Sequence, residues 1–316
     1  MFSTYGWNGT KCTPTITTFG NFQISIMRRG CKFTFCSIPS IRGKHKSRPE
    51  EEIIAETRRL VARGVKEVML IAQDLTYYGI DLYKENRFSN LLQSLSNIRG
   101  LEWIRMHYAY PAGFPLNVLD LIAERSNICN YIDMPIQHIN NRILSLMQRG
   151  HTREGTLQLL EKIKNTVPDT ALRTTLIVGF PGETDEEFEE LLEFVEKFRF
   201  HRLGVFTYSH EDGTTAFKLE DNVPAEVKQT RLERLMELQQ SISYKHNEDL
   251  VGKTLKVIVD REENGFYIGR TEYDSPEVDN EVLIEATNTD IKTGQFYPVK
   301  ISKADDFDLF GTVSQF

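Results

Sequence analysis

The sequence predicts an α/β fold, a partial (β/α)6 TIM-like barrel followed by a small antiparallel β-barrel. Three observations predict it. Six short apolar runs alternate with helical patterns, most of these runs are apolar almost throughout, and the chain changes to alternating strands near residue 249. Near-continuous apolar strands between helices are typical of a parallel sheet covered by helices, which closes into an open or partial barrel.

The expected elements follow one another from residue 22. Residues 1–21 lack periodicity and form an irregular lead-in, whereas residues 22–248 form the α/β core. Its helices include one over 49–64, one that opens with a capping box of Thr184 and Glu187, and a long one over 224–247. The six predicted strands are 22–26, 66–72, 102–109, 131–137, 172–179 and 202–208.

The last segment, residues 249–316, is predicted to be a separate antiparallel β-barrel. Four alternating strands, TLKVIVD, GFYIGRTEY, NEVLIEA and QFYPVKISKA, are separated by turns at Asn264-Gly265 and Thr293-Gly294. From Val251 onward there are 7 basic and 13 acidic residues, which account for most of the net charge of -7. Because the module is this acidic, we expect it to repel a phosphate backbone and to attract a basic partner.

The composition is that of a folded protein without a membrane-spanning body. The chain has 316 residues, of which 40% are hydrophobic and 26% charged, and its mean hydropathy is -0.38. These values exclude wholesale disorder and an integral membrane protein. No export signal is recognisable, so we expect a cytoplasmic protein with no membrane partner. Four cysteines are too few for a disulfide framework at this length.

Polar side chains follow the predicted strands at the points where the strands end. They are Gln73 and Asp74, His107, Gln137 and His138, the 179–183 turn and residues 208–211. Because the carboxyl ends of parallel strands meet at one edge, we expect an active site there. For Gln73 and Asp74 the alternative is a solvated loop after the second strand, and for His138 it is a purely structural role.

The turn GFPGET (179–184) joins a predicted strand to a predicted helix. Gly179 and Gly182 would let the backbone approach a ligand closely, and the first N–H groups of the helix could hold a carboxylate or a phosphate. A plain strand-to-helix connection is the alternative.

Cys31 and Cys36 lie in the loop after the first predicted strand. Arg28, Arg29 and Lys32 favour the thiolate form, which suits an iron-sulfur cluster or zinc. Two idle or packed thiols are the alternative, and the C-x4-C spacing is not that of a thioredoxin-like pair.

Seven motifs along the chain are informative when they are taken together. They are FCSIP, RGKHKSRP, LIAQDLTYYGIDLY, EWIRMHYAYP, DMPIQH, LRTTLIVGFPGETDEEF and FTYSHEDGT. Their succession resembles one enzyme family, the radical S-adenosylmethionine methylthiotransferases. The likeness extends from about Phe35 to the C-terminus and is greatest to the RimO branch, which modifies an aspartate in protein twelve of the small ribosomal subunit. The segment IGRTEYDSPEVDNEVLI resembles the TRAM domain of that family.

The resemblance implies cofactors, partners and site residues. Three cysteines would hold a 4Fe-4S cluster that binds S-adenosyl-L-methionine, and reduction by an electron donor would yield a deoxyadenosyl radical. A second cluster, in an N-terminal domain, serves sulfur delivery in the family. The residues implied at the cofactor site are Gln73, Asp74, Arg173, Gly179 and Gly182, with Cys31 and Cys36 at the metal.

The sequence departs from the family pattern in two respects. The family loop reads C-x3-C-x2-C, and counting back from Cys36 puts Phe33 at the second position and Arg29 at the first. Cys31 could serve only in a rearranged loop, and Cys12 is a conceivable third ligand. The family's N-terminal domain is also absent, as in a truncated copy. We therefore expect a cluster to assemble poorly and catalytic competence to be impaired.

Two substrates and two classes of function remain open. A sibling branch modifies adenosine in transfer RNA, but the acidic C-terminal module favours a Lys- and Arg-rich ribosomal protein. The basic stretch 42–48 is the counter-argument. A non-catalytic module that only binds the ribosomal protein is the alternative to an enzyme.

Overall fold

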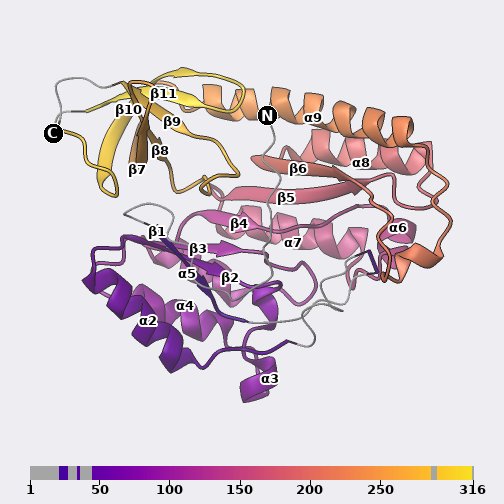
Figure 1. Ribbon diagram of the computed structural model, residues 1–316, viewed down its shortest axis with the longest axis horizontal. Helices are drawn as coiled ribbons and strands as arrows, with labels where there is room; N and C mark the ends of the chain where they lie inside the picture. Colours follow the sequence, from indigo (N-terminus) through magenta and orange to yellow (C-terminus); the bar gives the residue numbers. More distant parts are fainter. Residues whose placement is uncertain (1–20, 28–33, 36–44, 286–289, 315–316) are drawn as a thin grey trace.

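The protein has two parts, a six-stranded α/β part and a closed β-barrel (Figure 1). The computed structural model describes residues 21–27, 34–35, 45–285 and 290–314. The predicted lead-in lies almost wholly outside the described residues.

The α/β part contains the predicted strands and helices in the predicted order. Its strands are β1 (Asn21–Ser25), β2 (Glu67–Ile71), β3 (Trp103–His107), β4 (Tyr131–Asp133), β5 (Ala171–Val178) and β6 (Arg202–Thr207). Its helices are α2 (Glu50–Ala62), α3 (Ile80–Tyr83), α4 (Phe88–Ser96), α5 (Asn117–Glu124), α6 (Asn141–Leu146), α7 (Arg153–Thr166), α8 (Asp185–Phe198) and α9 (Ala225–Glu248), with short 3-10 turns η1 (Leu75–Tyr77) and η2 (Ala216–Lys218).

All strand pairs of this part are parallel, as predicted. The strands β1, β2 and β3 form one sheet, and β4, β5 and β6 form a second. The two sheets meet where Ile128 bridges Ile104 and where the Ala109 N–H donates to the Asp133 carbonyl at 2.8 Å. The six strands therefore follow one another in chain order around a partial barrel.

The strand β4 ends at Asp133, short of the predicted end at residue 137. Pro135 has no N–H group to donate to a ladder, and Gln137 has a left-handed backbone with φ of 70°. Gln137 still donates its N–H to the Thr175 carbonyl at 2.9 Å. The chain therefore stays beside β5 while its side chains leave the strand alternation.

The two faces of these strands differ in chemistry. The residues buried against the helices are apolar, among them Val68, Leu70, Ile104, Met106 and Leu176. The alternate residues point to the opposite side, which we call the inner face. It carries Glu67, Arg105, His107, Asp133, Arg173 and Arg202.

The C-terminal part is a closed barrel of five strands in the order β10-β11-β9-β8-β7. Four neighbouring pairs are antiparallel, as predicted, and β9 and β11 are parallel. The fifth strand, β11, is not predicted by the sequence pattern. The strands are β7 (Thr254–Glu263), β8 (Phe266–Arg270), β9 (Val282–Glu285), β10 (Phe296–Ala304) and β11 (Leu309–Val313).

The β8–β9 loop (residues 271–281) joins the two parts. Its backbone carbonyls at Thr271 and Glu272 accept hydrogen bonds from Arg105 of the inner face, at 3.3 and 2.7 Å. Its side chain Asp274 pairs with Arg202 at 2.5 Å, and both groups are buried. The loop thus covers the inner face of the α/β part, while α9 runs alongside and contacts β6 and β10 (Figure 1).

Glu67 lies at the centre of this contact. Its carboxylate accepts from Arg105 at 2.8 Å and from Arg270 of β8 at 2.6 Å, and all three side chains are buried. The two guanidinium groups hold the pKa of Glu67 at about 2, although burial acts in the opposite direction. One ionised carboxylate therefore contacts an arginine from each part of the protein, and Asp260 of β7 supplies a second carboxylate to Arg270 at 2.5 Å.

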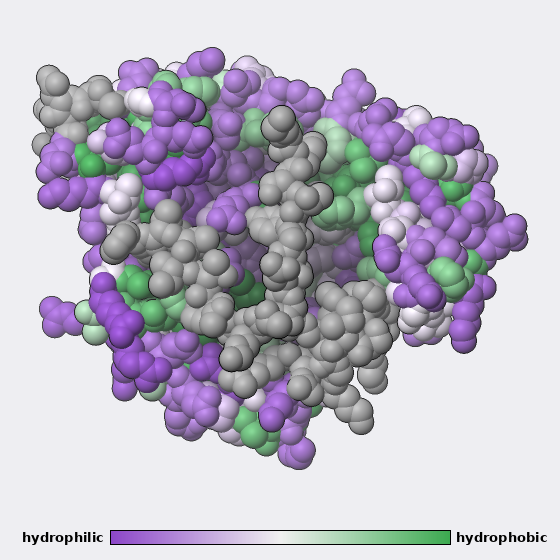
Figure 2. Space-filling model, viewed as in Figure 1, coloured by the Kyte–Doolittle hydropathy of each residue, from purple (hydrophilic) through white to green (hydrophobic). Residues whose placement is uncertain are grey.

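The face of the protein in Figure 2 is mainly polar where it is coloured. Most of the coloured side chains on the face in Figure 2 are hydrophilic, above all over the C-terminal barrel at the upper left. Within the described part of the chain, no helix combines the length and apolarity needed to cross a bilayer.

We predict that Glu67→Ala lowers the free energy of unfolding by about 3–5 kcal/mol, because it leaves the buried Arg105 without a counter-charge and the buried Arg270 with Asp260 alone. Glu102→Ala is the matched control, because Glu102 pairs across the same two parts with Lys256 at 3.1 Å but is half-exposed. Its expected cost is below about 1 kcal/mol. Urea unfolding of both variants measures the difference, and equal costs would contradict the central role of Glu67.

Candidate functional site

Gln73 and Asp74 follow β2 at the predicted rim. Asp74 caps η1, because its carboxylate accepts the Thr76 N–H at 2.9 Å and the Thr76 hydroxyl at 2.5 Å. Burial raises the pKa of Asp74. The amide oxygen of Gln73 is buried and has no hydrogen-bond partner among the described residues. Such an acceptor is costly unless a ligand or water donates to it.

The next rim residues lie around Asp133. Its carboxylate accepts from Arg173 at 2.9 Å and from the Tyr108 N–H at 3.1 Å, and His107 lies 3.6 Å away. The Arg173 Nε donates at 3.2 Å to Asp279 of the β8–β9 loop. Arg173 therefore lies between two carboxylates, and its role toward a cofactor stays a prediction.

Gln137 and His138 occupy different environments. The Gln137 amide oxygen is buried without a partner in the described residues, as in Gln73. His138 is fully buried, accepts the Asn140 N–H at its Nδ1 (3.0 Å), and lies 3.8 Å from Glu183 through its Nε2. Burial lowers the pKa of His138 to about 3, so the ring is neutral. Its Nε2 is buried and has no hydrogen-bond partner among the described residues, so the structural role of this histidine stays a prediction.

The 179–183 turn uses its own N–H groups. Gly179 and Phe180 donate to the Glu183 carboxylate at 2.8 and 3.3 Å, and Gly182 donates to Asn222 at 2.7 Å. At the start of α8, the predicted capping box of Thr184 and Glu187 is present. These hydrogen bonds occupy the N–H groups of Gly179, Phe180 and Gly182, and at the start of the helix those of Thr184 and Glu187.

The backbone conformation of this turn explains why it contains Gly179 and Gly182. Both have a positive φ, 70° at Gly179 and 80° at Gly182. A Cβ on Gly179 would lie 2.2 Å from the Lys228 side chain of α9. The close approach at Gly179 is therefore made by a helix of the same chain, and a cofactor role for either glycine stays a prediction.

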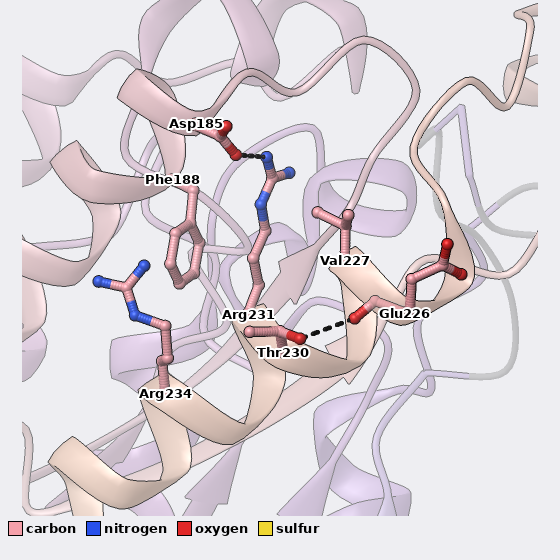
Figure 3. Close-up of a pocket in the computed structure, with 7 residues that line it drawn as sticks. All are labelled: Asp185, Phe188, Glu226, Val227, Thr230, Arg231 and Arg234. Carbon is pink, nitrogen blue, oxygen red and sulfur yellow. Dashed lines mark hydrogen bonds and ion pairs between the residues drawn. The ribbon is translucent and has the colours of Figure 1, made fainter.

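A pocket of about 190 Å³ lies between α8 and α9 (Figure 3). Phe188 and Val227 form its apolar wall, and Arg231 donates to Asp185 across it at 2.7 Å. It is lined by helices that cover the sheet and by none of the rim residues. We therefore do not identify it with the predicted cofactor site.

The predicted metal ligands Cys31 and Cys36 lie outside the described residues, as does Cys12. Cys129 is buried beside Trp103, and burial raises the pKa of its thiol to about 12. A thiol this difficult to ionise is a poor metal ligand. Among the residues that the structure describes, no group of three His, Cys, Asp or Glu side chains could hold a metal ion.

Two exposed aromatic residues at this edge were missed from the sequence. Phe206 alternates with Arg202 and Gly204 on β6, and 60% of its surface is accessible. Tyr108 follows β3 with a left-handed backbone and is 46% accessible. Alternation from Arg202 could have indicated Phe206, whereas no local pattern indicates the backbone of Tyr108.

The α/β part belongs to a radical S-adenosylmethionine protein, and the C-terminal barrel is a TRAM domain. Residues 26–195 match the radical SAM superfamily, and residues 251–313 match the TRAM domain. The chain is 52% identical over 297 residues to the ribosomal protein uS12 methylthiotransferase RimO of Christiangramia forsetii. It belongs to the RimO family of methylthiotransferases, as the sequence motifs predicted.

Other relatives agree. The RimO proteins of Flavobacterium johnsoniae and Bacteroides thetaiotaomicron are 52% and 50% identical, over 93% and 95% of this chain and 68% and 69% of theirs. The Christiangramia alignment covers 93% of this chain and 66% of that protein. The chain thus spans about two thirds of the length of these relatives.

Solved structures agree on the fold alone. Coproporphyrinogen III oxidase (HemN) from Escherichia coli, a radical SAM enzyme, has a TM-score of 0.52 and 20% identity, over 72% of this chain and 54% of that one. The radical S-adenosylmethionine methyltransferase TsrM from Kitasatospora setae, with cobalamin and a [4Fe-4S] cluster bound, has a TM-score of 0.50 and 17% identity, over 81% and 43%.

We predict that Gly179→Ala destabilises the protein by about 1–3 kcal/mol more than Gly213→Ala, because of the contact with Lys228. Gly213 is the matched control, since it has a φ of 79° and no atom within 4 Å of an added Cβ. Urea unfolding without any ligand measures both. Equal losses would mean that Lys228 is not the reason for the glycine.

Proposed function

We propose that this chain provides the S-adenosyl-L-methionine-binding barrel and the TRAM domain of a ribosomal protein uS12 methylthiotransferase, which adds a methylthio group to an aspartate of that protein. The observation that carries the proposal is the identity of about one half to RimO proteins over more than nine tenths of the chain. Likeness in fold alone would not distinguish this reaction from others of the superfamily.

The rim residues fit the nucleoside part of the cofactor. Gln73 and Gln137 each present a buried amide oxygen that accepts from no donor in the described part of the chain. S-adenosyl-L-methionine offers amino and hydroxyl donors, so it would satisfy acceptors that are otherwise costly to bury. We propose Gln73 and Gln137 as its polar contacts, and Asp74 as a neighbour that orients the segment after β2.

The donor set does not fit the iron-sulfur cluster of the family. At the three positions of the C-x3-C-x2-C loop, this chain has Arg29, Phe33 and Cys36. Neither arginine nor phenylalanine can supply the thiolate that holds a cluster iron. We therefore derive no reaction step through a cluster in this chain, and propose that its catalytic competence is low.

The partner that we propose is the small-subunit ribosomal protein, encountered in the cytoplasm. The TRAM domain is acidic, and several of its carboxylates are exposed, including Glu262, Glu263 and Asp290. Such a surface attracts a Lys- and Arg-rich protein and repels transfer RNA.

We predict that Phe33→Cys increases the iron retained after anaerobic reconstitution with iron and sulfide, and that Arg29→Cys/Phe33→Cys retains close to the four irons of one cluster. Iron and sulfide analysis of the desalted protein gives the result. Ser37→Cys adds a thiol outside the family spacing and controls for thiol number. Equal iron in all the variants would show that our alignment of the loop is wrong.

We predict that the protein binds uS12 and that the affinity falls as salt increases, whereas transfer RNA binds weakly at every salt concentration. Fluorescence anisotropy with labelled uS12 and labelled transfer RNA compares the two. Tight, salt-dependent binding of transfer RNA would overturn the choice of substrate.

A further inference from the structure

Tyr108, the residue directly after β3, has a left-handed backbone with φ of 64°. This conformation is uncommon for a bulky residue. Two hydrogen bonds hold it: the Tyr108 N–H donates to the Asp133 carboxylate at 3.1 Å, and the Tyr108 carbonyl accepts the Leu75 N–H at 3.1 Å. Strained residues of this kind persist where the surroundings determine the conformation, and they concentrate at functional sites.

The ring of Tyr108 is open to solvent and yet surrounded by the site. About 46% of the residue is accessible. Its phenol nevertheless lies within electrostatic reach of Asp133 and Arg173, and the surrounding protein raises its pKa by desolvation. The ring of His107 lies beside it, with centroids 6.1 Å apart. Tyr108 is therefore an accessible residue beside charged groups of the inner face.

The TRAM domain stabilises the left-handed backbone of Tyr108 through a series of hydrogen bonds. Asp279 of the β8–β9 loop accepts from Arg173 at 3.2 Å and from the Tyr131 hydroxyl at 2.6 Å. Arg173 in turn holds Asp133 at 2.9 Å, and Asp133 holds the backbone of Tyr108. Hydrogen bonds therefore connect Asp279 of the TRAM domain, through Arg173 and Asp133, to the backbone of Tyr108.

We propose that Tyr108 is a binding residue whose ring contacts S-adenosyl-L-methionine, and that Asp279 is a positioning residue that acts on it through Arg173 and Asp133. The proposal rests on the proposed function, because that function supplies the ligand. An aromatic face attracts a cation such as a sulfonium and stacks on an aromatic base. The Leu75 contact connects Tyr108 to the segment that starts with Gln73, whose amide oxygen lacks a donor.

The first test is the affinity of the purified full chain for S-adenosyl-L-methionine, measured by equilibrium dialysis. We expect Tyr108→Leu to bind at least about tenfold more weakly, and Tyr108→Phe to stay within about threefold of the wild type because the ring remains. Tyr244→Leu, at an exposed position of α9, is the matched control. Binding by Tyr108→Leu within twofold of the wild type would overturn the proposal.

The second test separates binding from folding. Tyr108→Gly removes the ring and suits the left-handed backbone, so we expect an unchanged or higher urea midpoint together with the loss of affinity. A lower midpoint with unchanged affinity would mean that Tyr108 is a packing residue, and would contradict the proposal.

The third test addresses Asp279. We expect Asp279→Asn to weaken binding in the wild-type background and to have no further effect in Tyr108→Leu, as a double-mutant cycle would record. Equal effects in the two backgrounds would overturn the positioning role.

Gln73→Ala distinguishes the two proposals. If the wild type binds, Gln73→Ala binds weakly and Tyr108→Leu binds normally, only the inference about Tyr108 fails. If the wild type does not bind S-adenosyl-L-methionine, the proposed function fails and the role of Tyr108 fails with it.

Discussion

The pairing of inner-face arginines with acceptors of the TRAM domain is the interaction on which the rest of this structure depends. Arg105 and Arg202 belong to strands of the α/β part, and burial of either charge without a partner would be strongly unfavourable. Carbonyls and carboxylates of the β8–β9 loop supply those partners. In return, Glu67 of β2 pairs with Arg270 of the TRAM domain, which Asp260 of the same domain also contacts. Each part therefore supplies partners to buried charges of the other, most completely where Asp274 pairs with Arg202.

This arrangement determines where a ligand can bind. The β8–β9 loop covers the inner face from Glu67, at the start of β2, to His107, the last residue of β3, whose Nε2 lies 3.0 Å from the Ser275 hydroxyl. Beyond it, after β2, β3 and β4, lie the accessible Tyr108 and the amide oxygens of Gln73 and Gln137, which have no donor among the described residues. The TRAM domain thus stabilises the α/β part by binding its inner-face arginines. Its acidic surface, in addition, favours binding of a basic partner. Hydrogen bonds connect the two parts at Tyr108, because its N–H donates to Asp133 and Asp133 accepts from Arg173, which also donates to Asp279 of the TRAM domain.

The sequence predicted the elements whose signals are local. Six strands and the capping box of α8 follow from hydrophobic periodicity and from the spacing of Thr184 and Glu187, because both depend on nearby residues. The early end of β4 was missed although Pro135 is a local signal for it, whereas the strand β11 depends on pairing with distant strands. In the candidate site, the motifs indicated Gln73 correctly as a rim residue, whereas the neighbours of Gly179 and Arg173 come from α9 and the β8–β9 loop. Such neighbours depend on tertiary packing, which periodicity does not encode.

The mutual charge balance of the two parts is tested most directly by scanning calorimetry of the full chain. If the buried arginines bind the parts into one unit, the barrel and the TRAM domain unfold together, in a single transition whose calorimetric and van't Hoff enthalpies agree. Two resolved transitions, each with the enthalpy of one part, would contradict this account, because either part would then be stable without the charges of the other.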